Sequence, residues 1–393
     1  MKTFPVDTLE AEYYFTKPVF LDENYILLTP ETQLSKQLID RLKRWSYETV
    51  LSDGDLVAKP IANASGEGGE TVALSVDQDV RENSLFREAQ EFYEEVLSFV
   101  ERVFTNFVTR NDLQERQIGD MVKRIIDMVR SHRRYILRLS EMNVKDKNYI
   151  VAHSSKTAIV AVAIGMTLRQ PPHKLIELGT AALLHEIGMV RLPPQLYMSQ
   201  QKLSTKERQA ISAHTVLGFK ILRQASFPMS VCLAVLECRE NVDGSGYPRK
   251  LTGEKISLYA KVIMVAGSFA AITSNRPYRE ASDGHSAILE MLKQRGKMYD
   301  ETVLKALVAN LSIYPIGTQV QLANGTRGKV VDTNMENPRS PHVRVIAGPN
   351  GERYAEQQVV DTGSDPEHRV VKAISPDESE GQAESTPTAA KSQ

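Results

Sequence analysis

Apolar residues recur every three or four positions through most of the sequence between residues 84 and 310. This spacing gathers them on one face of an α-helix, whereas a half-buried strand would alternate with a period of two. The clearest runs carry Phe86, Ala89, Tyr93, Val96, Val100, Val103 and Phe107, and then Ile118, Val122, Ile125 and Val129. The chain is therefore predicted to be mainly α, with an all-helical bundle as its largest part.

The two ends of the chain carry a different pattern. The run YILLT at 25–29, the helical spacing that follows it and the run ETVLSDGDLV predict a small N-terminal α/β unit. After Tyr314–Pro315, the stretch TQVQLANGTRGKVVD alternates around Asn324–Gly325, a dipeptide typical of tight hairpins. A short C-terminal β appendage is predicted there. The last residues are rich in Ser, Glu, Pro and Ala and predict disorder.

These patterns divide the chain into six predicted parts. They are a small α/β domain (1–58), a linker (59–83), a helical hairpin (84–145), a helical domain (146–313), the β appendage (314–362) and a disordered tail (363–393). The hairpin turns near Asn111–Asp112, where Asp112 is a candidate N-cap for the second helix. Two roles stay open for this hairpin: a packing element, or a coupling or dimerisation element, which keeps a homodimer among the expected partners.

Composition and charge exclude several classes of protein. The 48 Lys and Arg residues balance 49 Asp and Glu residues, which argues against a dedicated nucleic-acid binder. Two cysteines, Cys232 and Cys238, are too few for a disulfide framework and indicate a reducing compartment. The N-terminal residues lack a secretory signal, and no apolar run approaches the roughly 18–20 residues of a membrane span. A cytoplasmic protein without a membrane span or a nucleic-acid partner is predicted.

Several polar residues interrupt the apolar runs in a way that suits a metal site. His153 lies in an apolar run, the adjacent pair His185–Glu186 follows about thirty residues later, and His214 lies further along the chain. Imidazole nitrogens and carboxylate oxygens are suitable ligands for Zn, Fe or Mn. A histidine in an apolar helix is also common as a hydrogen-bonded core residue, so these residues alone leave both readings open.

Two further motifs make the pattern much more specific. The stretch DGSGYP at 243–248 is followed about thirty residues later by TSNRPYR at 273–279. Together with the histidines, these motifs resemble the HD-GYP family of metal-dependent phosphohydrolases, which are known as cyclic di-GMP phosphodiesterases. The resemblance runs from Tyr149 to Ile316 and extends weakly into the β appendage. It implies an HD-type helical bundle and a role in bacterial cyclic di-GMP signalling.

The resemblance also implies a set of metal ligands, and several of them are replaced here. The family holds one metal with a His, an adjacent His–Asp pair and a later Asp, and a second metal with the shared Asp, a further His and a His–His pair. This chain keeps His153, His185 and His214, and Glu186 replaces the paired Asp. The other family ligand positions hold Cys238, Arg239 and Gly267, and three nearby departures are Tyr149, Met189 and Ala270.

These replacements predict a catalytically impaired, degenerate member of the family. Gly267 offers no side-chain ligand, and Arg239 cannot lose its proton to coordinate a cation. Hydrolysis by two metals needs both ions, so that machinery is expected to be broken. The residual candidate ligands are His153, His185, Glu186, His214 and Cys238, with Glu186 also the residual catalytic candidate. We expect no metal, or one divalent transition metal (Fe, Mn or Zn) at reduced occupancy.

Other features of the resemblance persist and leave alternatives open. Arg276 and Arg279 match positions that contact the dinucleotide's phosphates, so with Arg239 they predict a receptor for cyclic di-GMP or a related phosphate ligand. The loop formed by Asp243, Gly244, Ser245, Gly246, Tyr247 and Pro248 is intact and suits a contact with a signalling protein, or serves folding alone. If Arg239 pairs with Glu186, the cleft is neutralised and a protein scaffold is favoured. An active phosphodiesterase with a rebuilt one-metal site remains the alternative.

Overall fold

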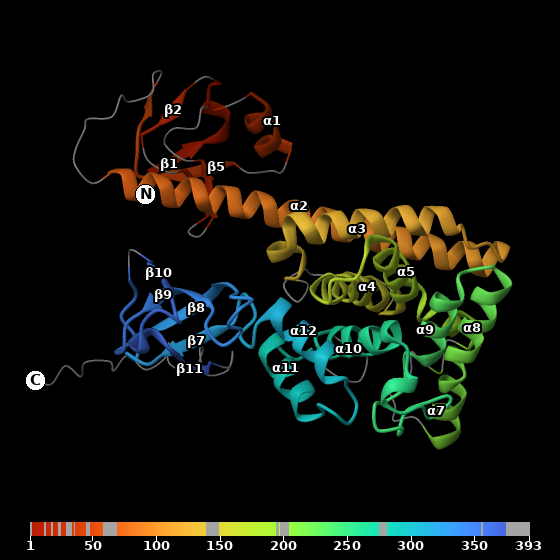
Figure 1. The fold of residues 1–393 in the computed structure, drawn as a ribbon. Coiled ribbons are helices and arrows are strands. Elements are labelled where there is room, and N and C mark those ends of the chain that lie inside the picture. The colour runs from red at the N-terminus through yellow and green to blue at the C-terminus, as the bar shows by residue number, and fades with distance from the viewer. Residues whose placement is uncertain are drawn as a thin grey trace, which may run out of the picture. The chain divides into compact units, whose positions relative to one another are not determined.

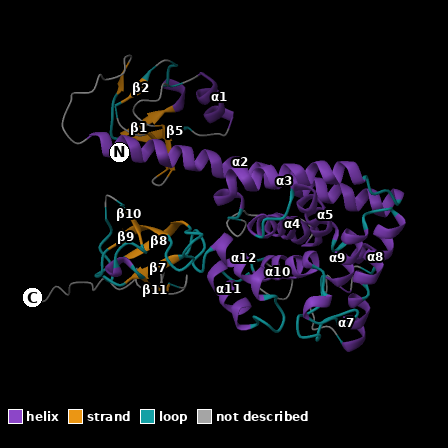
Figure 2. Ribbon diagram, in the orientation of Figure 1, coloured by secondary structure: helices purple, strands orange, loops and turns teal. Residues whose placement is uncertain are grey.

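The predicted helical character is confirmed, and Figure 2 shows strands only before α2 and after α12 among the described residues. The computed structural model describes residues 2–11, 13–16, 19–22, 25–28, 34, 36–44, 48–57, 69–138, 149–193, 196, 204–274, 281–354 and 357–374. The chain divides into two units, Met1–Asp79 and Val80–Gln393. Among the described residues, the first unit has one apolar core and the second has two, one in its helices and one in its C-terminal sheet.

The described part of the first unit is a small α/β structure, as predicted. Its larger sheet has the order β1-β5-β3-β4 and is antiparallel throughout. The elements of this unit are β1 (Lys2–Pro5), η1 (Val6–Thr8), β2 (Tyr14–Phe15), β3 (Val19–Asp22), β4 (Tyr25–Leu28), α1 (Lys36–Arg44), β5 (Thr49–Ser52) and β6 (Leu56–Val57). Helix α1 buries Ile39 and Leu42 against Phe15 and Val50 in the core of the unit.

A helical hairpin follows, and its details correct two expectations. Helix α2 (Gly69–Arg110) begins inside the segment that composition assigned to the linker 59–83. The linker was predicted because of Gly66, Gly68 and Gly69, although good helix formers such as Glu70, Ala73 and Leu74 follow within five residues. Helix α3 (Glu115–Ile136) has Gln114 as its N-cap residue, so the prediction for Asp112 was wrong. The Asp112 carboxylate instead accepts a hydrogen bond from Gln114 Nε2 at 3.3 Å.

The helical domain is built around α4 (Tyr149–Thr167), which packs against α3, α5, α10 and α12 (Figure 1). The other elements are α5 (Pro172–Leu184), η2 (Ile187–Arg191), α7 (Thr205–Ser212), α8 (His214–Gln224), α9 (Met229–Glu237), η3 (Gly253–Lys255), α10 (Leu258–Ile272), α11 (Gly284–Lys293) and α12 (Glu301–Leu311). Within the described residues, α4 is the one helix whose length and composition would suit a membrane span, and 83% of its apolar window is buried inside the bundle.

The C-terminal β appendage is an antiparallel sheet with the order β10-β9-β8-β7-β11. Its strands are β7 (Gln319–Leu322), β8 (Arg327–Asp332), β9 (His342–Ala347), β10 (Val359–Asp361) and β11 (Val370–Ala373), and η4 (Pro366–His368) precedes the last one. The hairpin predicted around Asn324–Gly325 is confirmed, because β7 pairs with β8 and Gly325 adopts a φ of 84°.

The chain stays ordered beyond residue 363, where composition placed the start of a disordered tail. Strand β11 pairs with β7, and Val370 is buried in the core of the sheet. A short VVKA strand adds one apolar residue to an existing core, which the polar composition of the surrounding sequence conceals. The prediction was therefore wrong for residues 363–374, and residues 375–393 lie outside the described part of the chain.

Candidate functional site

Residues from the ends of three helices and from inside a fourth meet at one buried centre. His153 lies in α4, His185 and Glu186 directly follow α5, and His214 is the first residue of α8. Their exposed fractions are only 2%, 1%, 3% and 1%. Arg239 directly follows Cys238, the C-cap residue of α9. The helical domain therefore brings together residues that are up to 86 positions apart, from 153 to 239.

Glycine allows the two halves of this centre to approach. A Cβ atom at Gly188, in η2, would lie only 1.9 Å from the carbonyl oxygen of His214. No side chain fits in that space, so residue 188, the second after Glu186, must be glycine for α8 to pack against η2. This close approach places His214 opposite Glu186.

The carboxylate of Glu186 is the focus of the centre. Its Oε1 lies 3.5 Å from His185 Nε2 and 3.7 Å from His153 Nε2. Its Oε2 lies 3.8 Å from His214 Nε2. The Nε2 atoms of His153 and His185 are 3.3 Å apart. Three of the predicted ligands, His153, His185 and Glu186, thus offer ligand atoms within 4.8 Å of one another.

Backbone carbonyl groups orient two of the imidazoles toward Glu186. His185 Nδ1 donates to the carbonyl of Ala182 at 2.7 Å, and His214 Nδ1 donates to that of Ile211 at 2.7 Å. Each Nε2 atom is left with a lone pair that faces the carboxylate. Burial lowers the pKa of His185 to about 4 and also lowers the pKa of His214, although Glu186 opposes both shifts. Both rings are therefore neutral at pH 7.

Arg239 supplies a positive charge to the same carboxylate. Its Nη2 donates a hydrogen bond to Glu186 Oε1. Burial alone would raise the pKa of Glu186, but Arg239, followed by the three imidazoles, holds this pKa well below its usual range. Glu186 is thus ionised and tied to a guanidinium. Of the two arrangements that the sequence left open for Arg239, the structure has the paired one.

A divalent cation fits this arrangement poorly. The imidazoles of His153 and His185 face Glu186 Oε1. The same oxygen accepts the hydrogen bond from the Arg239 guanidinium. A guanidinium stays charged and would repel a metal ion at this oxygen. On the other side, His214 Nε2 and Glu186 Oε2 are buried and make no hydrogen bond within the described part of the chain. Donor atoms that could bind a metal are thus present, but the Arg239 guanidinium is bound to one of them, Glu186 Oε1.

Two of the replaced positions also lie where the resemblance places them. A Cβ atom at Gly267, in α10, would lie 3.8 Å from His153 Cε1 and 3.7 Å from the Thr157 side chain. This is ordinary contact distance, so the position has room for a Cβ atom, and glycine supplies no ligand there. Cys238 donates its thiol to the carbonyl of Val235 at 3.3 Å, and burial raises its pKa to about 12. The protonated thiol is a poor ligand.

The chain that directly follows the loop Asp243–Pro248 is held by two buried carboxylates, whose structural role sequence reasoning did not identify. Glu240 accepts hydrogen bonds from the backbone N–H groups of Arg249 at 2.6 Å and Leu251 at 3.0 Å. Glu237 accepts from Arg249 Nη1 and from the Ser257 N–H, each at 3.0 Å. Both oxygens of Glu240 thus bind backbone N–H groups, so this carboxylate holds the chain after the loop rather than serving as a free acid of the cleft.

The same loop contacts the buried centre through Tyr247. The Tyr247 ring meets the His214 ring edge-on, with centroids 6.4 Å apart. Gly246 is required at this point, because a Cβ atom there would lie 2.3 Å from the Asn241 backbone nitrogen. Asp243 Oδ1 accepts from the backbone N–H and the hydroxyl of Ser245 at 2.9 and 2.6 Å. The loop is thus a fixed structure beside the centre.

The predicted phosphate contacts Arg276 and Arg279 lie outside the described residues. The described chain before them ends at Ser274, whose hydroxyl accepts a hydrogen bond from Lys156 Nζ at 2.9 Å. Burial lowers the pKa of Lys156 to about 8. Sequence reasoning missed this lysine, although a single cation inside the apolar run of α4, three residues after His153, was a usable signal.

The part of the chain that carries this centre matches a known family model. Residues 137–303 match the model of the HD domain family, and residues 319–382 match a KOW domain associated with the HD domain. The chain is 33% identical over 199 residues to a cyclic di-GMP phosphodiesterase of Borreliella burgdorferi, covering 51% of this chain and 52% of the relative. It is 32% identical over 249 residues to a cyclic di-GMP phosphodiesterase of Pseudomonas aeruginosa, covering 62% of this chain and 59% of the relative.

The chain thus spans about half to three fifths of the length of these two relatives. Among solved structures, it is similar to an HDG"Y"P protein from Bdellovibrio bacteriovorus, with a TM-score of 0.48 and 16% identity. That match covers 78% of this chain and 97% of the other.

Proposed function

Because the chain carries an HD domain at residues 137–303, we propose that it is a signalling protein with a catalytically impaired HD centre that acts as a protein-interaction scaffold. One observation carries this proposal: Arg239 donates to Glu186 Oε1, the carboxylate oxygen that also faces His153 and His185. An internal ion pair balances the charge that a metal would otherwise balance. It does so without the Lewis acidity that phosphodiester hydrolysis by metals requires.

The pairing also weakens the case for a nucleotide receptor. A guanidinium that is tied to a buried carboxylate has little net charge left for a phosphate. Arg276 and Arg279 remain as candidate phosphate contacts. The relatives are named for cyclic di-GMP, so this dinucleotide is the ligand to test first. A receptor function would depend on those two arginines rather than on Arg239.

The proposed contact surface is the loop Asp243–Pro248. Its base is fixed by Glu237 and Glu240, and it exposes Asp243 and Ser245 to solvent. A surface that is ordered before binding loses less conformational freedom when a partner docks. A signalling protein that recognises this loop is therefore the proposed partner.

A second candidate is an active cyclic di-GMP phosphodiesterase with a one-metal centre. It is favoured by the close approach of His153, His185 and Glu186 and by the names of the relatives. In this alternative the three residues hold Fe, Mn or Zn after Arg239 has moved away from Glu186. Glu186 is then the residual catalytic carboxylate.

Metal analysis and an activity assay separate the two candidates. The full chain, purified without chelator, should contain well below one transition metal per chain and should give no linear product from cyclic di-GMP with added Mn²⁺ or Fe²⁺. The combined variant Glu186→Asp, Cys238→His, Arg239→His and Gly267→Asp should recover metal binding before turnover. Two metals per chain, or turnover that His185→Ala abolishes, would overturn the proposal. One metal per chain would shift support to the second candidate.

Calorimetry with cyclic di-GMP separates a scaffold from a receptor. A scaffold predicts no heat of binding at high micromolar dinucleotide. Binding that weakens by about tenfold or more in Arg276→Ala would instead support a receptor, since each tenfold change matches the loss of one charge-assisted contact. The variant Asp243→Ala, in the exposed loop, is the matched control, because it should leave dinucleotide binding unchanged.

A further inference from the structure

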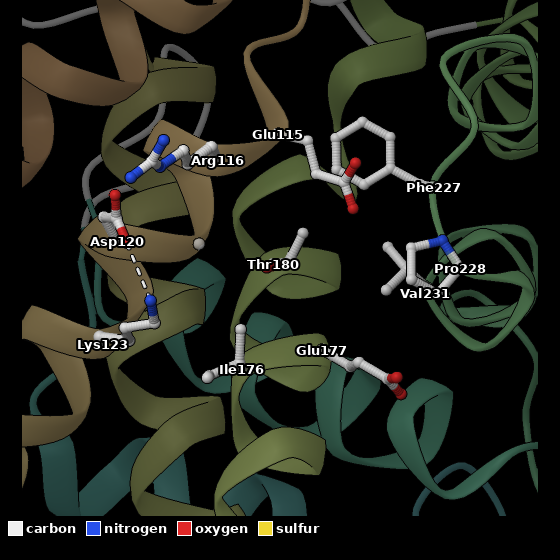
Figure 3. A pocket seen from close by; sticks show the side chains of 11 residues that line it. Glu115, Arg116, Asp120, Lys123, Ile176, Glu177, Thr180, Phe227, Pro228 and Val231 are labelled. Atoms are coloured by element: carbon white, nitrogen blue, oxygen red, sulfur yellow. Dashed lines mark hydrogen bonds and ion pairs between the residues drawn. The ribbon is translucent and has the colours of Figure 1, made fainter.

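A groove of about 390 Å³ opens on the helical domain, and its lining comes from α3, α5 and the start of α9 (Figure 3). None of the residues at the buried centre around Glu186 lines this groove. Helices α5 and α9 connect the groove with that centre. Beside the groove, Glu177 of α5 accepts a hydrogen bond from Ser230 of α9 at 2.8 Å. Just after the C-terminal ends of the same two helices, Glu186 pairs with Arg239.

Gly119 is the residue that keeps this groove open. It lies inside α3, and a Cβ atom built there would meet no atom within 4 Å. Glycine inside a helix is destabilising compared with alanine. Neither packing nor backbone conformation requires it at this position. Because Gly119 has no side chain, the space beside it remains part of the groove.

One side of the groove is apolar, and Thr180 lies between this side and α3. Phe227 and Val231 line the groove and are only 4% and 1% exposed, and Ile176 adds a further apolar surface. The volume lies within the range of roughly 300–1,000 Å³ that is typical of small-molecule sites. The space therefore suits one aromatic ring or branched apolar group rather than a segment of protein.

Charge is distributed unevenly around the groove. Figure 3 shows Glu115 and Glu177 on the side of Phe227, whereas Arg116, Asp120 and Lys123 lie on the opposite side, where Asp120 and Lys123 pair at 2.9 Å. Glu177 is held by Ser230 and by the Tyr259 hydroxyl at 3.1 Å. The Glu115 side chain makes no hydrogen bond or ion pair among the described residues. The apolar side thus presents carboxylates only.

We propose that this groove binds a small molecule in which an aromatic or branched apolar group is joined to a primary amine. The apolar group packs on Phe227 and Val231, and the ammonium donates to the free carboxylate of Glu115. A hydrogen bond between two charged groups is stronger than one between neutral groups, so the ammonium sets the preference of the site. The side chain that Gly119 lacks would overlap the apolar group.

The test uses three probes of similar size on the full chain: 2-phenylethylamine, 2-phenylethanol and phenylacetate. Methyl NMR signals of Ile176 and Val231 should shift and saturate with the amine, which should bind roughly tenfold more tightly than phenylacetate. In Glu115→Gln the affinity for the amine should fall to that for the neutral alcohol. Glu101→Gln, on α2 and outside the groove, should leave the preference unchanged.

Filling the groove provides the second arm. Gly119→Leu should abolish binding of all three probes, while Gly119→Ala should retain binding of the amine and raise the melting temperature. Circular dichroism verifies that each variant is folded; if Gly119→Leu fails to fold, the Glu115→Gln comparison still decides. Equal affinity for the amine and phenylacetate, amine binding that survives in folded Gly119→Leu, or no methyl shift at millimolar amine would each overturn the proposal.

Discussion

Glu186 and Glu240 are both buried carboxylates of the same helical domain, but their surroundings differ. Glu240 is 2% exposed, and each of its oxygens accepts a hydrogen bond from a backbone N–H group. Glu186 is 3% exposed; one oxygen accepts from Arg239, and the other makes no hydrogen bond with any residue that the structure describes. Buried acceptors are nearly always satisfied. Glu240 thus has the contacts of a structural carboxylate. Glu186 keeps an unsatisfied oxygen and faces imidazoles, as a metal-binding carboxylate does.

The two arginines that follow α9 extend the comparison. Arg239 pairs with Glu186 and has a side chain that is 23% exposed, whereas Arg249 pairs with Glu237 and is 50% exposed. An ion pair that water reaches contributes little, while removal of one partner from a buried pair is strongly destabilising. The Arg239 pair should therefore dominate the stability of this region.

The largest expected effect is that of Arg239→Met, which removes the guanidinium and keeps an apolar side chain of similar length. The free energy of unfolding should fall by about 4 kcal/mol, because an ionised Glu186 is left buried without a counter-charge. Added Mn²⁺ should restore part of this loss, since the cation that competes with a metal is gone. Urea denaturation followed by circular dichroism, with Mn²⁺ and with EDTA, measures both effects.

The wild-type chain is the control for this metal response, and its unfolding should be the same in Mn²⁺ and in EDTA. A loss below about 1 kcal/mol in Arg239→Met would place the pair among ordinary surface ion pairs and end the comparison. Wild-type stabilisation by Mn²⁺ would show that the metal displaces Arg239.

The next effect is on the pH dependence of stability. Burial lowers the pKa of His185 from 6.5 to about 4, so the folded chain takes up this proton at a lower pH than the unfolded chain. Stability is thus fully present above pH 6.5 and is lost as the pH falls toward 4, by about 3 kcal/mol for this group. The lowered pKa of His214 adds to the loss in the same direction.

Denaturation midpoints at pH 7 and pH 4.5 measure this slope in the wild type and in His185→Asn. The variant should lose part of the slope, whereas His173→Asn, at an exposed histidine, should keep it. An unchanged slope in His185→Asn would contradict the neutral, buried state of this ring.

A smaller effect is expected for Glu240→Gln. The amide turns a donor toward one of the two N–H groups of the loop, so one buried N–H loses its acceptor at a cost of about 2 kcal/mol. Hydrogen exchange at the Arg249 and Leu251 amides should become faster, and Mn²⁺ should have no influence. The exposed Glu254→Gln is the control, and it should change neither quantity.

These residues also show how far the sequence could predict the site. The apolar periodicity predicted the helical domain, and the resemblance carried by the histidines and the DGSGYP motif implied which residues belong to the centre. The pairing of Arg239 with Glu186 was only one of two alternatives. Whether Arg239 is paired or free depends on how the C-terminal ends of α5 and α9 pack against each other, which the sequence alone does not specify.

The misses have a common physical cause. Glu237 and Glu240 look like solvent-exposed acids at a helix end, and only the fold of residues 243–257 supplies the N–H groups that bury them. The start of α2 and the strand β11 were missed because composition averages over a segment, whereas one buried apolar face is enough to order it. Lys156 was overlooked inside the apolar run of α4.

The smallest expected effect is that of Arg249→Met, which is the sharpest control for the comparison. Half of this side chain is exposed, so its ion pair with Glu237 is screened by water, and the loss should be about 1 kcal/mol or less. The backbone N–H of residue 249 still donates to Glu240, and Ser257 still donates to Glu237, so neither carboxylate loses all its partners. Mn²⁺ should not change the result, because no imidazole faces Glu237 among the described residues. Urea denaturation beside Arg239→Met measures the contrast directly. Equal losses in the two variants, or a metal response in Arg249→Met, would mean that the centre at Glu186 is no different from a structural ion pair.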